Sequence, residues 1–166
     1  MKRPLLAAAL VLLFLAHAFF YFATLGYDAV DDAYISFRYA QNAIRGHGLV
    51  FNPGERVEGF TNFLWTALMT PIVGASLDVG RVSIALGLLF ALGIFWLTLQ
   101  FPRALKLPEA TGWLAAFLLA VDGSFALWSV GGLETAMFAF LVAAGALFYL
   151  REQASLPLGK GEQVRD

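Results

Sequence analysis

The chain of 166 residues contains no cysteine, and this absence excludes disulfide bonds, thiolate nucleophiles and cysteine-based zinc sites. Charged residues are scarce as well, at 14% of the sequence, whereas roughly a quarter of an ordinary soluble domain is charged. The formal net charge is only −1, so no surplus of basic residues points to nucleic acid as a partner. Internal repeats and low-complexity segments are also missing from the sequence.

Hydrophobic residues, in contrast, make up 60% of the chain, and the mean hydropathy is +0.72. A water-soluble fold of this length would have too little polar surface to cover so many apolar side chains. Membrane lipid solvates them directly, and it is therefore the first partner that we expect. Because backbone amides in lipid must be hydrogen-bonded within the protein, the apolar segments should be helices. The predicted fold class is an all-α integral membrane protein.

Apolar stretches suggest four to five hydrophobic helices. They cover about residues 5–25, 60–76, 82–101, 110–130 and 133–150, and a polar tail follows at 151–166. The first continues well past the signal-peptide-like Ala16-His17-Ala18, which favours an uncleaved anchor over a cleaved signal peptide. Lys2 and Arg3 before it predict a cytoplasmic N-terminus and an extracytoplasmic loop at 26–59. The second stretch is short and contains Pro71.

The stretch at 110–130 carries Asp122-Gly123 in its middle, and this pair leaves the topology open. If all five stretches cross the membrane, Glu134 lies on the cytoplasmic side, opposite the first loop. If the chain breaks at Asp122 and returns, Glu134 lies on the same side as the first loop. An acid followed by glycine is costly on a lipid-facing helix. We favour the re-entrant version, although it places Arg103 and Lys106 outside.

The loop at 26–59 contains the pattern of an amphipathic helix suited to the membrane surface. Asp31 or Asp32 can cap its start, and Gly46 and Gly48 end it. Its apolar face is predicted to carry Ala33, Phe37, Ala40 and Ile44. The polar face is predicted to carry Asp31, Arg38, Gln41, Asn42 and Arg45. Trp65, at the start of the second stretch, is expected as an interfacial anchor.

Simpler roles also fit these residues. Paired acids next to a membrane helix are often solvated caps, and the dipole of the following helix explains Glu134. Asp122 is expected to be structural, marking the break in its helix. Neither His17 nor His47 has a partner at metal-ligand spacing, so neither is given a role.

Taken together, several segments resemble the first extracytoplasmic loop of GT-C membrane glycosyltransferases, closest to the bacterial terminal arabinofuranosyltransferase-like group. They are Asp-Asp-Ala-Tyr-Ile-Ser-Phe-Arg-Tyr-Ala at 31–40, Gly-Leu-Val-Phe-Asn at 48–52, Gly-Glu-Arg-Val-Glu-Gly at 54–59 and Thr-Asn-Phe-Leu-Trp at 61–65. A second match, Trp-Ser-Val-Gly-Gly-Leu-Glu-Thr at 128–135, is similar to a Ser-Gly-Leu-Glu-Thr element later in those enzymes.

The resemblance implies that residues 1–150 are the N-terminal part of a GT-C transmembrane domain in the bacterial cytoplasmic (inner) membrane. It implies transfer of a sugar from a polyprenyl-phosphate donor to a cell-envelope glycan or lipid acceptor, with the active loop extracytoplasmic. An acceptor hydroxyl needs a carboxylate to take its proton, and Asp31 or Asp32 is the candidate catalytic base. Arg38 is the candidate that stabilises the departing phosphate.

Glu134 is the second candidate substrate-binding residue. The resemblance implies that with Asp32 it could hold a divalent cation, which is optional because many family members need none. The alternative interpretation of the whole chain is a small non-catalytic membrane protein that binds a lipid-linked sugar or a partner subunit. A transporter fragment is less favoured, because inverted repeats are not evident.

Overall fold

The computed structural model describes residues 2–155, and their regular structure consists of α-helices without a β-strand. The helices are α1 (Lys2–Thr24), α2 (Ala33–Ile44), α3 (Phe63–Gly74), α4 (Val79–Thr98), α5 (Phe101–Ala104), α6 (Glu109–Val121), α7 (Gly123–Ser129) and α8 (Thr135–Ser155). The polar tail predicted at 151–166 begins inside α8, and its residues from 156 onward lie outside the described residues.

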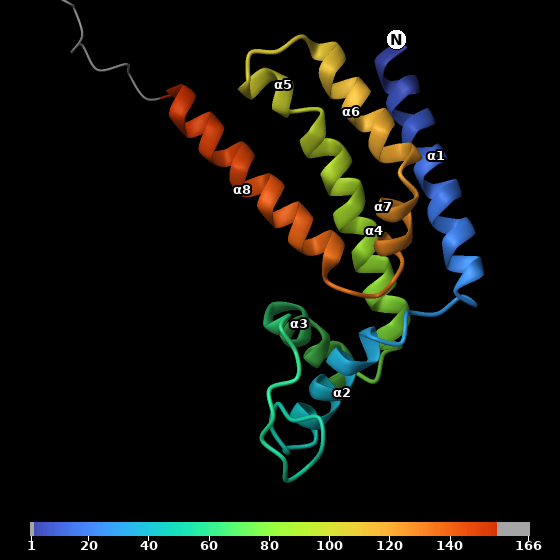
Figure 1. Ribbon diagram of the computed structural model, residues 1–166, viewed down its shortest axis with the longest axis vertical. Helices are drawn as coiled ribbons and strands as arrows, with labels where there is room; N and C mark the ends of the chain where they lie inside the picture. Colours follow the sequence, from blue (N-terminus) through green and yellow to red (C-terminus); the bar gives the residue numbers. More distant parts are fainter. Residues whose placement is uncertain (1, 156–166) are drawn as a thin grey trace, which may run out of the picture.

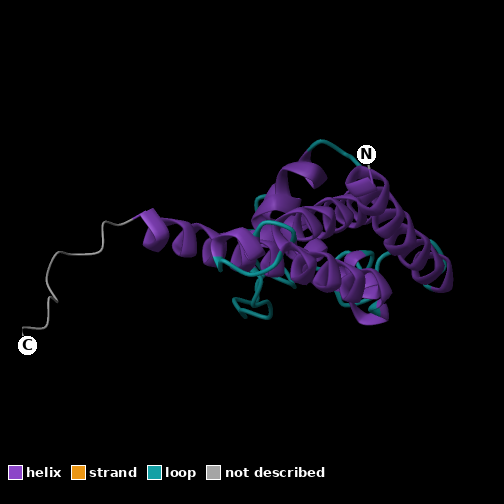
Figure 2. Ribbon diagram, turned by 90° about the horizontal axis from the view of Figure 1, so that it is seen from above, coloured by secondary structure: helices purple, strands orange, loops and turns teal. Residues whose placement is uncertain are grey.

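The long helices α1, α4, α6 and α8 run side by side as a bundle, in which α1 contacts α6 and α4 contacts α8 (Figure 1). The shorter helices α2 and α3 lie together at one end of this bundle. We call that end, with the connecting loop at 45–62, the loop end. The opposite end, around residues 99–108, is called the far end. Seen from above, α8 extends away from the other helices toward the C-terminus (Figure 2).

The all-helical membrane fold predicted from composition is confirmed. Three helices are long and apolar enough to cross a membrane: α1, the continuous run of α4 and α5, and α8. The pair α6–α7, bent by 68°, makes a fourth if it is counted as one span. Within residues 2–155, the number of membrane-length helices is therefore three to four.

The helix predicted at 60–76 forms as α3, but it is shorter than a span. Its 12 residues extend for about 18 Å at 1.5 Å per residue, whereas the hydrocarbon core is ~30 Å thick. Residues 60–62 belong to the preceding loop, and the helix ends at Gly74. Apolar composition alone did not reveal these ends. As a result, α3 lies against α2 at the loop end and does not run along the bundle (Figure 1).

Aromatic rings and glycines bring the bundle helices together. Phe14 of α1, Phe95 of α4 and Phe125 of α7 form one cluster, with ring centroids 5.1–5.9 Å apart. A side chain at Gly87 of α4 would come within 2.5 Å of the Ser129 carbonyl oxygen of α7, so only glycine allows this approach of two backbones. This close contact fixes the end of α7 against α4.

The break in the fourth helix lies at Asp122, as predicted. Its carboxylate caps α7 by accepting a hydrogen bond from the Phe125 amide, so its role is structural. Just before the break, the Ala120 carbonyl has lost its partner within the helix, and His17 Nδ1 of α1 donates to it over 3.0 Å. His17, to which the sequence analysis assigned no role, therefore stabilises the end of α6.

After the break the chain does not turn back. It follows α1 from end to end: Arg3 pairs with Glu109 at 2.8 Å, and the Val30 amide donates to the Gly131 carbonyl at 3.0 Å. Glu134 thus lies at the loop end, as the re-entrant version required. The chain reaches that end by running along the whole bundle and not by turning back at Asp122. Because α3 does not run along the bundle, α6–α7 needs no reversal, and the loop containing Lys106 lies at the far end (Figure 1).

Candidate functional site

The predicted helix after the two acids is α2, and most of its predicted apolar face is buried. Ala33, Phe37 and Ala40 are almost completely inaccessible. Ile44 is half exposed, but its Cδ1 atom lies 3.1 Å from the position that a Cβ on Gly74 would take. The apolar face therefore packs on α3, which covers the surface that the sequence assigned to the membrane.

Asp32 occupies the N-cap position of α2, but its side chain makes no capping hydrogen bond. The Asp31 carboxylate accepts a hydrogen bond from the Asp32 amide at 3.0 Å. Both side chains are exposed. The simpler interpretation of this pair, as caps of the helix, is thus not supported by the hydrogen bonds, and the Asp32 carboxylate is available for other contacts.

The polar face of α2 differs from the prediction at one residue. Asn42, predicted on the polar face, is 1% exposed, and its Nδ2 donates to the carbonyls of Val50 and Phe51, both at 2.8 Å. A buried amide that hydrogen-bonds to the backbone of a loop fixes the path of that loop. Asn42 therefore has an architectural role, and this position of the polar face is turned toward the loop and not toward solvent.

The second matched segment, 128–135, docks on the first loop. The Gly131 carbonyl accepts from the Val30 amide, and the Gly132 carbonyl accepts from Trp65 Nε1 at 3.1 Å. Gly132 has φ = +81°, and a Cβ there would lie 2.6 Å from the Ala29 Cβ. Glycine is required here for both reasons. Trp65 is completely buried in this contact, so the prediction of an interfacial anchor was wrong.

Docking brings Glu134 to a small polar network. Its Oε2 accepts a hydrogen bond from Asn62 Nδ2 at 2.7 Å. Asn62 also contacts the Ser36 hydroxyl of α2, at 2.9 Å from Nδ2, and the Thr66 hydroxyl of α3, at 3.2 Å from Oδ1. Glu134 directly precedes α8, where the helix dipole also favours a carboxylate. The network thus joins α2, α3 and α8 at one point.

The geometry of α2 separates the two acids that the sequence could not separate. Asp32 has helical dihedrals and lies one turn before Ser36, so the two share the face that looks toward Asn62. Ala33, next to Asp32, lies 3.4 Å from the position of a Cβ on Gly132. Helical spacing therefore assigns Asp32 to the side of α2 on which Ser36 contacts Asn62, the partner of Glu134.

Arg38 does not join this group. It lies two residues after Ser36 and so on the opposite side of α2. Its Nε donates to the Phe51 carbonyl at 3.2 Å. It lines a separate cavity of about 570 Å³ with Tyr34 and Leu77, between α2 and the start of α4. Of the four predicted site residues, Glu134 contacts the polar network, Asp32 is assigned to the same side of α2 by helical spacing, Arg38 lies on the opposite side, and Asp31 precedes the helix.

The divalent cation stays a prediction. Among residues 2–155, no group of three or more His, Asp or Glu side chains is arranged to hold a metal ion. Asp32 and Glu134 are the two ligands that the family resemblance predicts for the cation, and they would supply two carboxylates.

Glu134 and Asn62 form the polar end of a groove between α3 and α8, with a volume of about 650 Å³. Its other walls are mainly apolar: Phe63, Leu64, Trp65, Met137, Phe138 and Leu141. A carboxylate and an amide above an apolar groove can bind an amphipathic molecule. Sequence reasoning gave Asn62 no role. The only sign of its role in the sequence was the position of one amide side chain directly before an apolar helix.

Sequence reasoning also did not predict the contact between Tyr34 and Asp28 at the loop end. The Tyr34 hydroxyl donates to Asp28 Oδ1 at 2.8 Å. This hydrogen bond raises the pKa of Tyr34 above its usual value, with burial and the charges of Asp28 and Asp78 as smaller causes. The pair stiffens the turn between α1 and α2.

Part of this sequence is similar to a known protein. A terminal β-(1→2)-arabinofuranosyltransferase of Mycobacterium tuberculosis is 39% identical over 64 residues, which are 37% of this chain and 10% of that protein. The match therefore spans about a tenth of the length of that relative. No model of a protein family matches the chain, and no solved structure matches it. The likeness supports, at a coarse level, a relation to a membrane glycosyltransferase.

Proposed function

We propose that the chain forms the N-terminal part of a glycosyltransferase that moves a sugar from a polyprenyl-phosphate donor to a glycan or lipid acceptor. The observation that carries this proposal is the contact between Asn62 and Glu134. Through it, the two segments that resemble GT-C enzymes, far apart in the sequence, meet at one end of the bundle. The partial likeness to the mycobacterial arabinofuranosyltransferase supports the same reading.

Asp32 is the proposed base. The acceptor hydroxyl gives its proton to the Asp32 carboxylate while its oxygen bonds to the anomeric carbon of the donor sugar. The bond between that carbon and the phosphate oxygen breaks, and its electron pair leaves with the phosphate. Glu134 and Asn62, on the same side of α2, orient the reacting hydroxyl by accepting and donating hydrogen bonds. A divalent cation, if bound, would be held by Asp32 and Glu134 and would neutralise phosphate charge.

Two further features support the arrangement. The apolar groove that begins at Glu134 suits the hydrocarbon chain of a lipid substrate. Arg3, Arg103 and Lys106 belong to the far end, which the positive-inside rule assigns to the cytoplasm. The loop end would then face the outer side of the bacterial cytoplasmic membrane. Phosphate binding by Arg38 stays a prediction, since its cavity lies on the other face of α2.

The test is transfer of labelled arabinofuranose from a polyprenyl-phosphate donor by the protein, in the longest form that its gene encodes, reconstituted in lipid vesicles. Asp32→Asn should lower the rate by about a hundredfold or more, because it removes the base. Glu55→Gln is the matched control, an exposed loop acid bonded only to Asn52, and it should keep the wild-type rate. Full activity of Asp32→Asn would refute the assignment. Donor binding without any turnover would favour the non-catalytic alternative.

A further inference from the structure

The segment that returns from α2 to α3, residues 46–60, is exposed, yet buried side chains hold it in place. Asn42 binds two successive carbonyls at its start. Tyr39, which is 1% exposed, reaches its end: the hydroxyl donates to the Val57 carbonyl at 2.9 Å and accepts from the Gly59 amide at 2.8 Å. Loops that bind ligands are commonly held by such rigid support.

The Tyr39 contacts enclose one residue. Because the hydroxyl binds the backbone on both sides of Glu58, the backbone position of that residue is held in place. A Cβ on Gly59 would lie 2.8 Å from the Tyr39 oxygen, so a larger residue would displace this support. A buried tyrosine thus positions an exposed acid, which is more support than a solvated loop charge needs.

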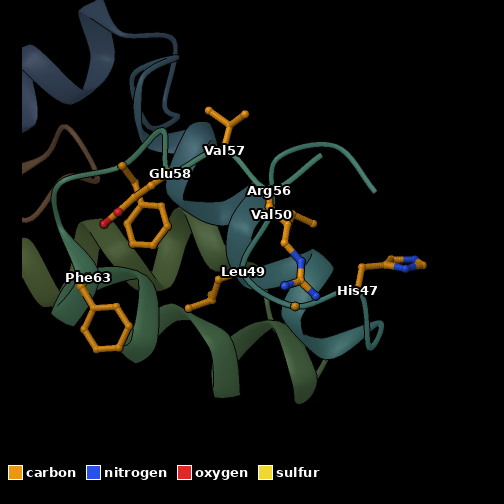
Figure 3. A pocket seen from close by; sticks show the side chains of 9 residues that line it. His47, Leu49, Val50, Arg56, Val57, Glu58 and Phe63 are labelled. Atoms are coloured by element: carbon orange, nitrogen blue, oxygen red, sulfur yellow. The ribbon is translucent and has the colours of Figure 1, made fainter. Parts of the chain in front are cut away.

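Arg56 and Glu58 lie two residues apart in this segment, which is neither helix nor strand, and both residues are exposed. Val57, between them, points away from both side chains (Figure 3). Neither charged side chain has a hydrogen-bond or ion-pair partner within residues 2–155. Two exposed, opposite charges without partners of their own in this part of the chain can bind an external molecule through both donors and acceptors.

These two side chains line a hollow of about 490 Å³. Leu49, Phe60 and Phe63 supply apolar walls, and His47 stands at the rim with its ring pointing away from the other labelled side chains (Figure 3). Phe63 also lines the groove that contains Glu134. The hollow is therefore the immediate neighbour of the candidate site, on the side away from the bundle.

We propose that this hollow binds a saccharide, and that it holds the part of the acceptor glycan next to the reacting sugar. A polyol offers donors to Glu58, acceptors to Arg56 and apolar C–H faces to the phenylalanines. With one acid and one guanidinium, the hollow carries no surplus positive charge of the kind that a phosphate or an anionic headgroup requires. The saccharide assignment stands on the hollow itself, whereas its role as acceptor site rests on the proposed function.

The experiment measures binding of a linear arabinofuranose oligosaccharide to the purified protein in detergent, without donor, by titration calorimetry. Arg56→Ala and Glu58→Gln should each raise the Kd by about tenfold or more, since each loses a charge-assisted hydrogen bond. Glu55→Gln, the neighbouring loop acid outside the hollow, should leave the Kd unchanged. Thermal unfolding and circular dichroism of all variants should match the wild type, because neither side chain supports the fold.

Two results would overturn the saccharide site: no saturable binding by the wild type, or equal binding by wild type and both variants. Preferential, Arg56-dependent binding to vesicles of an anionic phospholipid, without oligosaccharide binding, would overturn it as well and make the hollow a membrane contact. The Asp32→Asn variant separates the two proposals. If both the variant and the wild type bind the oligosaccharide normally and neither transfers sugar, or both transfer it at the same rate, the saccharide site stands and the proposed function fails.

Discussion

The two ends of the helix bundle are held together by different interactions. At the loop end, buried or half-buried polar side chains connect segments that are remote in sequence, as in the contacts of Tyr39, Asn62 and Trp65. At the far end, α5 packs on α6 and α8, and the polar contacts between helices include an exposed ion pair of Arg3 with Glu109 and a long contact from Arg151 to Gln100 at 3.3 Å. Buried polar groups specify one arrangement much more strictly than exposed charges do. The comparison indicates that the side chains are held most strictly at the loop end, where we propose that the reaction takes place.

The largest effect should come from disturbing the docked segment at the loop end. Gly132→Ala forces a side chain toward the Ala29 Cβ at a positive φ, which should lower the free energy of unfolding by about 2–4 kcal/mol and displace Glu134. Thermal unfolding in detergent and the transfer assay measure both effects. Gly145→Ala in α8, where a Cβ would meet nothing within 4 Å, is the control and should be neutral or slightly stabilising. Equal behaviour of the two variants would mean that the docking is not specific.

A smaller effect is expected at the centre of the polar network. Asn62→Ala leaves Glu134 and Ser36 without their shared partner and should lower the free energy of unfolding by about 1–3 kcal/mol. Chemical denaturation and proteolysis of the loop end would report the loss. Asn52→Ala is the matched control, because this exposed asparagine binds only Glu55, and its effect should stay near zero. Equal changes in the free energy of unfolding for Asn62→Ala and Asn52→Ala would show that the network does not stabilise the fold.

At the far end, Arg3→Gln should change little. It removes an ion pair whose side chains are 71% and 43% exposed, and such pairs contribute less than about 1 kcal/mol. The same denaturation measurement applies, and added salt should reduce the small difference further. A loss as large as that of Asn62→Ala would contradict the contrast between the two ends.

The smallest effect concerns pH. Because the pKa of Tyr34 is raised, its hydrogen bond to Asp28 stabilises the fold below the ordinary tyrosine pKa of about 10 and is lost as pH rises through the raised value. Tyrosinate absorbance, measured as the difference between wild type and Tyr34→Phe, gives its titration. Asp28→Asn should shift that titration toward lower pH. Superimposable curves for wild type and Asp28→Asn would show that the bond has no effect in solution.

Sequence reasoning was accurate where the pattern is local. The apolar period of α2 identified Ala33, Phe37 and Ala40, because burial on one face of a helix follows from spacing. The break at Asp122 was also predicted, since an acid followed by glycine interrupts a helix by itself.

The remaining features depend on partners that are remote in sequence. Asn42 is buried because the loop that follows α2 returns and places its carbonyls against the Asn42 amide. Trp65 is buried because the segment containing Gly132 packs on its indole ring. The length of α3 was overestimated, since nothing local showed that Asn62 would leave the helix to bind Glu134. Separating Asp32 from Asp31 required knowing which face of α2 meets Asn62.

The contact between Asn62 and Glu134 joins residues 72 positions apart. During synthesis, α1, α2 and α3 leave the ribosome before the segment that completes their polar network. Until Gly131 and Gly132 follow, the Asn62 amide and the Trp65 indole lack their final partners. Assembly of the site is therefore a late, long-range step of biogenesis. A nascent chain halted after α4 would carry both aspartates and the loop, yet would not hold them in a finished site.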